Sequence, residues 1–144
     1  EEALTAELGE AGAAPLLATW REAFPRAYRD GESAAQGVAD LLLARRATEA
    51  GRPAAALSRP PGADARTLTL RLVNPGGPLP LADALPLFGS LDLRAIEEVP
   101  HRLTPAGARP AVLHVFTLHA AVDCAEDRFA PLLDALAALL DGRA

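Results

Sequence analysis

The sequence contains no lysine and no methionine, and Cys124 is its single cysteine. One cysteine cannot form a disulfide within the chain, which predicts a protein of the reducing cytoplasm. No apolar run approaches the roughly 20 residues that span a bilayer, and the acidic start lacks the basic region of a signal peptide. The sequence therefore predicts no membrane partner, and the missing methionine predicts a piece cut from a longer protein.

Aromatic residues make up only 4% of the chain, and 14 basic against 19 acidic residues leave a net charge of −5. Proteins that bind nucleic acids need clustered basic side chains to neutralise phosphates, and many stack aromatic rings on bases. Because both features are scarce, we expect no nucleic-acid partner. Half of the 144 residues are hydrophobic, which is enough for one domain to bury a core without disulfides.

Helical patterns occupy the first third of the chain. Two short helices are expected at residues 3–9 and 13–24, and a longer one at 33–50. Ser33 is the expected N-cap of the third helix, and Gly51 lies just past its end. We predict that residues 1–52 form a helical linker segment.

After residue 53 the spacing of hydrophobic residues changes from the helical pattern to the alternating pattern of β-strands. The segment 67–72 alternates leucine with polar residues, which predicts a strand with one buried face. Similar patterns predict the remaining strands at 54–59, 93–100 and 111–119.

Two further helices are expected among these strands. Asp83 is the expected N-cap of a short helix at 84–90, with Pro86 in its first turn. Leucines that recur every three or four residues predict the second helix at 125–141.

The element order ββαββα predicts an α+β domain over residues 53–144. Each strand pair has one apolar face and each helix one apolar stripe, so we expect a four-stranded antiparallel sheet with two helices on one face. A circular permutation of a ferredoxin-like βαββαβ unit would produce the same layout.

The residue types and spacings assemble no catalytic, cofactor-binding or metal-binding site. His114 and His119 are five residues apart, so on one strand they point to opposite faces and cannot share a metal. Cys124 stands among acidic residues that disfavour the thiolate a nucleophile requires. We therefore predict that the chain itself catalyses no reaction.

One segment could bind a small ligand. The residues after strand 67–72 are rich in glycine and proline and lead into a helix, where backbone N–H groups can bind a carboxylate. An ordinary tight turn uses the same residue types, so both interpretations stay open. The predicted ligand-binding residues are Asn74, Gly76, Gly77, Leu79 and Asp83.

Several segments carry a family likeness in their order and spacing: 24–29 (FPRAYR), 38–40 (VAD), 76–86 (GGPLPLADALP), 93–100 (LRAIEEVP) and 113–116 (LHVF). With them, the chain resembles the non-catalytic ACT-like region that precedes the catalytic domain of the large bacterial NAD-specific glutamate dehydrogenases. Two departures stand out. Val115 replaces an acidic residue of the family pattern, and Asp92 stands where glycine is expected, although aspartate tolerates a left-handed conformation.

The resemblance implies a parent enzyme that uses NAD to deaminate glutamate oxidatively. This chain lacks lysine and any Gly-x-Gly-x-x-Gly unit, so it is expected to contain neither the active site nor the NAD site. As an ACT-like module it is expected to regulate or assemble the enzyme. The implied partners are the catalytic region and other modules of the parent chain, further copies in a homo-oligomer and an amino-acid effector. The alternative is a purely structural interaction domain without a small ligand.

Overall fold

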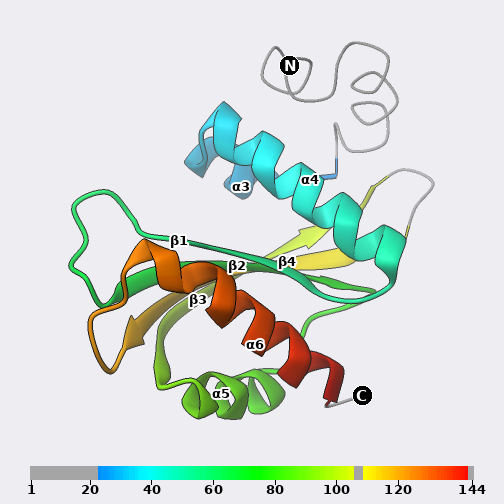
Figure 1. The fold of residues 1–144 in the computed structure, drawn as a ribbon. Helices are drawn as coiled ribbons and strands as arrows, with labels where there is room; N and C mark the ends of the chain where they lie inside the picture. The colour runs from blue at the N-terminus through cyan, green and yellow to red at the C-terminus, as the bar shows by residue number, and fades with distance from the viewer. Residues whose placement is uncertain (1–22, 106–108, 143–144) are drawn as a thin grey trace.

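An antiparallel four-stranded sheet lies between two layers of helices in the structure, a computed structural model that describes residues 23–105 and 109–142 (Figure 1). The strand order is β1-β2-β4-β3, so β1 and β3 form the two edges. The strands are β1 (Ala54–Ser58), β2 (Thr67–Pro75), β3 (Leu93–Leu103) and β4 (Ala111–Ala120).

Helices cover both faces of this sheet (Figure 1). One face carries α3 (Arg26–Gly31) and α4 (Ala34–Ala50). The other carries α5 (Leu81–Ser90) and α6 (Phe129–Gly142), the latter preceded by the short 3₁₀ turn η1 (Glu126–Arg128). The predicted α+β class, the order ββαββα and the pair of helices on one face are all confirmed. The strand order is that of a ferredoxin-like unit whose last edge strand has moved to the front as β1.

The sheet has a hydrophobic core on each side. The core beneath α5 and α6 contains the leucines of β2 and two aromatic rings, Phe88 and Phe116, whose centroids lie 4.9 Å apart in an edge-to-face contact. On the opposite face, α4 packs Ala44 and Ala47 against Val73. The expectation of a single buried face for strand 67–72 is therefore wrong, because α4 covers the side that carries its polar residues.

The long N-terminal helix agrees with its sequence pattern. The Ser33 hydroxyl accepts a hydrogen bond from the Gln36 N–H at 3.1 Å, and Gly51 ends the helix with a left-handed φ of 69°. The helices expected at 3–9 and 13–24 lie outside the described residues, except that 23–24 form a turn. The short helix α3 was not expected; it begins directly after Pro25, whose ring favours the conformation of a helix start.

The segment between β2 and α5 differs most from the prediction. Strand β2 continues through Pro75, and α5 begins at Leu81 instead of residue 84. Pro80 occupies the N-cap position, so Asp83 lies in the first turn and does not cap the helix; Pro86 lies one turn further along. Asp92 adopts the expected left-handed conformation, with φ 58°.

The division at residue 52 stays a prediction, although α4 rests on the same sheet that the later residues form. Within the described part of the chain, no helix combines the length and the apolar composition needed to cross a bilayer.

Candidate functional site

The loop between β2 and α5 contains most of the predicted ligand-binding residues, and hydrogen bonds fix its shape. The Asn74 side-chain amide donates to the Gly77 carbonyl at 2.8 Å, and the Gly76 N–H donates to the Pro110 carbonyl at 2.7 Å. Gly76 has φ 91°, a conformation that residues with a side chain rarely adopt. The Leu79 N–H donates to His114 Nε2 at 2.9 Å.

These bonds limit what the loop can offer a ligand. The N–H groups of Gly76 and Leu79 are already used inside the protein, and the prolines of the loop have none. A row of free N–H groups, as the sequence pattern suggested, is therefore absent from this loop. Asn74 lies near the end of β2, Gly76, Gly77 and Leu79 lie in the loop, and Asp83 follows on α5. Their ligand role stays a prediction.

His114 holds this loop against the sheet, a role that sequence reasoning missed. Its side chain is 3% exposed, and its Nδ1 lies 2.9 Å from Glu98 Oε2. Because Nε2 accepts the hydrogen bond of Leu79, the proton of the neutral ring belongs on Nδ1, which donates to Glu98. His114 lies opposite Leu72 and His119 opposite Thr67, so the two histidines do face opposite sides of the sheet.

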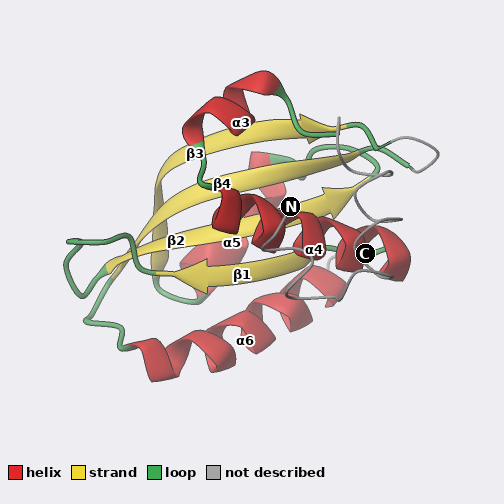
Figure 2. Cartoon of the chain, turned by 90° about the horizontal axis from the view of Figure 1, so that it is seen from above, coloured by secondary structure: helices red, strands yellow, loops and turns green. Residues whose placement is uncertain are grey.

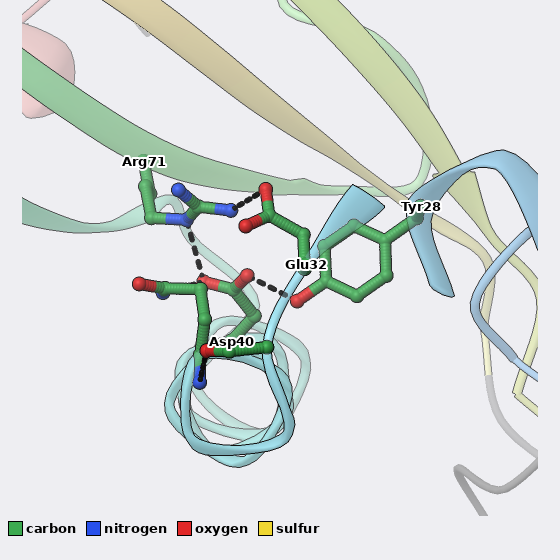
Figure 3. A network of polar contacts seen from close by, with 6 residues as sticks. Tyr28, Glu32, Asp40 and Arg71 are labelled. Atoms are coloured by element: carbon green, nitrogen blue, oxygen red, sulfur yellow. Dashed lines mark hydrogen bonds and ion pairs between the residues drawn. The ribbon is translucent and has the colours of Figure 1, made fainter. Parts of the chain in front are cut away.

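A second polar cluster lies under α4 (Figure 3). The carboxylate of Asp40 accepts hydrogen bonds from Tyr28 Oη, from Gln36 Nε2 at 3.0 Å and from Arg71 Nε at 2.9 Å. The other side of the Arg71 guanidinium donates to Glu32 Oε2 at 2.6 Å. Asp40 is 1% and Arg71 8% exposed, so both charges are removed from water and stabilised by each other.

The cluster changes how its members titrate. Burial, together with the hydrogen bond to Asp40 and its charge, raises the pKa of Tyr28 far above its ordinary value. Burial alone would lower the pKa of Arg71, but the carboxylates of Asp40 and Glu32 outweigh it and raise that pKa. The His101 ring packs edge-on against the Tyr28 ring, with centroids 5.2 Å apart. Burial lowers the pKa of His101. The cluster therefore keeps the Tyr28 hydroxyl protonated and the Arg71 guanidinium charged, and it suits a structural role.

The remaining reactive groups do not converge. Within residues 23–105 and 109–142, no three side chains of histidine, cysteine, aspartate or glutamate gather as they would around a metal ion. Cys124 is buried, and its thiol lies 3.9 Å from the Ala125 carbonyl.

Comparison with known proteins finds two protein-family models that match the chain. One describes "Glutamate dehydrogenase, ACT3 domain" and matches residues 52–129; the other describes "Glutamate dehydrogenase, helical motif 2" and matches residues 3–46. These matches confirm the resemblance found in the sequence.

Two curated relatives are both named NAD-specific glutamate dehydrogenase. The protein of Halomonas elongata is 35% identical over 100 residues, which is 69% of this chain. The protein of Pseudomonas aeruginosa is 30% identical over 109 residues, which is 76% of this chain. The aligned segments make up only 6% and 7% of these relatives, so the chain corresponds to a small part of each.

Removing the carboxylate of Asp40 tests the energetic role of the cluster. Asp40→Ala should lower the free energy of unfolding by about 3 kcal/mol, because it removes the buried carboxylate that both Arg71 and Tyr28 bind. A triple variant, Tyr28→Phe with Asp40→Leu and Arg71→Met, removes the three most buried polar groups together and should recover most of the loss. Urea denaturation followed by circular dichroism measures both. Equal losses in the two variants would contradict an ion pair that acts as a unit.

The titration of Tyr28 gives a second test. The chain has one tyrosine, so phenolate absorbance reports on Tyr28 alone. The pKa of Tyr28 in the folded chain lies above the unfolded value of about 10. The stability that the protonated hydroxyl contributes is therefore complete below pH ~10 and is lost as the pH rises towards the folded pKa. Phenolate absorbance should appear only as the helical circular dichroism disappears. Ionisation near pH 10 in the folded chain, as in a urea-unfolded reference, would contradict this.

Proposed function

Since the chain belongs to the family of the glutamate dehydrogenase ACT3 domain, we propose that it is a non-catalytic regulatory and oligomerisation module of an NAD-specific glutamate dehydrogenase. The parent enzyme would convert L-glutamate to 2-oxoglutarate with NAD in amino-acid catabolism, in the cytoplasm. The names of the relatives support this assignment.

The residues of this chain do not fit the catalytic part of such an enzyme. NAD binding in a Rossmann fold needs a strand, a Gly-x-Gly-x-x-Gly turn and a helix, and the sequence contains no such turn. It also contains no lysine to assist deamination. In this proposal NAD and glutamate bind elsewhere in the parent chain, and this module acts through contacts.

The observation that carries the regulatory role is the fixed loop between β2 and α5. A loop held in one shape can bind a small ligand without a large loss of conformational entropy. The Arg109 guanidinium lies beside it, so close that a Cβ on Gly76 would be 3.6 Å from Arg109 Nη2. A guanidinium is well suited to pair with the carboxylate of an amino acid. Asn74 and Arg109 are therefore the proposed contacts for an amino-acid effector.

Regulation would follow from a difference in affinity. An amino acid that binds more tightly in one arrangement of the modules shifts the enzyme towards that arrangement, by an amount set by the two affinities. The catalytic region, the neighbouring modules and further copies in a homo-oligomer are the proposed partners of these contacts.

A purely structural interaction domain is the alternative. The internal use of the Gly76 and Leu79 N–H groups favours it, because it leaves the loop with fewer backbone donors for a ligand. In that case the module would assemble the enzyme without sensing a small molecule.

Calorimetry on the chain separates these roles. Titration with glutamate, aspartate and the branched-chain amino acids should give binding heat for at least one of them. Arg109→Gln should weaken that binding by about threefold or more. Arg109 follows the end of β3, whereas Arg94 lies at the start of that strand. The control Arg94→Gln therefore removes a charge of the same sign far from the loop and should leave binding unchanged.

Absence of heat with every amino acid would contradict the ligand role and leave the structural alternative. The same chain, mixed with glutamate and NAD, should form no NADH. Turnover there would contradict the non-catalytic assignment.

A further inference from the structure

The two edges of the sheet differ in how they are protected from pairing with another strand. Strand β3 carries a bulge between Ala95 and Glu97, a proline at Pro100 and several charged residues. All three features discourage a foreign strand from joining an edge. Strand β1 has the sequence Ala-Ala-Ala-Leu-Ser, without charge, proline or bulge. Apart from its short length of five residues, the β1 edge has none of the protections found on β3.

The β1 edge forms the floor of a groove of about 570 Å³. Helices α4 and α6 lie on either side of it, and Figure 2 shows β1 at the margin of the sheet with both helices alongside. From α4, Arg46 and Ala50 line the groove; from α6, Leu133, Asp134 and Ala137 line it. The groove combines an unpaired strand edge with one basic and one mainly apolar wall.

We propose that this groove binds an extended peptide segment, which adds to β1 as a fifth strand of the sheet. Successive side chains of a strand point to opposite faces, so alternate residues of the segment would face α4 and α6. The segment would place small apolar side chains against Leu133 and Ala137, and a carboxylate beside Arg46. Backbone hydrogen bonds to β1 supply affinity in this mode, and the two walls supply selectivity.

The charges of the groove favour such a peptide over a second copy of this chain. Among the described residues, neither Arg46 nor Asp134 forms an ion pair, whereas Arg52 pairs with Asp141 at 3.7 Å. If two copies paired antiparallel through β1, their α4 helices would lie on the same face and bring the two Arg46 side chains towards each other. A segment with a carboxylate on that side would instead neutralise Arg46.

This inference names a surface for the interaction role proposed above and rests on that role. The probe is an acetylated and amidated seven-residue peptide in which valine alternates with threonine and the central threonine is replaced by glutamate. A matched probe carries lysine there. By fluorescence polarisation, the glutamate probe should bind the whole chain about threefold more tightly than the lysine probe, and Arg46→Glu should reverse that preference.

The helix α6 supplies a matched pair of variants. Ala137 lines the groove, while Ala138 is exposed on the same helix and does not. Ala137→Glu should weaken binding of the glutamate probe severalfold, because it places a like charge in the groove. Ala138→Glu should leave binding unchanged. Both variants should keep the circular dichroism and the amino-acid binding of the unsubstituted chain. These two readouts separate failure of this surface from failure of the proposed regulatory role.

Three results would overturn the inference: no binding of either probe, an equal effect of Ala137→Glu and Ala138→Glu, or unchanged preference in Arg46→Glu. Light scattering that shows dimers which Ala137→Glu dissociates would also overturn it, because the occupant would then be a second copy.

Discussion

Asp40 and Arg71 are both buried between α4 and the sheet and form an ion pair there, and Glu32 binds the other side of Arg71. Arg71 comes from the middle of β2, and its side chain is only 10% exposed beneath α4. Without Asp40, Arg71 would keep only the pairing with Glu32 at the margin of the cluster, and its Nε–H would lose its acceptor, at a cost in stability. The pair therefore fastens α4 to one position on the sheet. That position completes a second hydrophobic core on this face and one wall of the groove beside β1.

A different set of polar contacts fixes the neighbouring segments on each face of the sheet. On one face, His114 links the loop before α5 to β3 and β4 through Leu79 and Glu98. On the other, the Asp40 cluster secures the helices that precede the sheet. Both devices hold backbone in place and neither presents a reactive group. Both therefore suit the contact role proposed above for this module.

Much of the fold was predictable because the hydrophobic period changes from helix to strand near residue 53. The left-handed residue Asp92 and the capped helix 33–50 depend on local chemistry and were also predictable. The buried role of Arg71 was not, since a charged residue in an alternating strand resembles a solvated face until its partners, 31 and 39 residues away, are known. The loop was located correctly, but its hydrogen bonds involve His114 and Pro110 from distant parts of the chain, and short-range patterns carry no signal for such pairings.

The stability of the sheet without its N-terminal helices tests the central claim most directly. Urea unfolding of residues 23–144 is compared with that of 53–144, which lacks α3 and α4. We predict that 23–144 unfolds in one cooperative transition, and that 53–144 loses cooperativity and binds a hydrophobic dye, because Arg71 and the apolar residues Val73 and Leu113 become exposed. Cooperative unfolding of 53–144 with an undiminished free energy would show that the sheet is stable alone and would contradict the account.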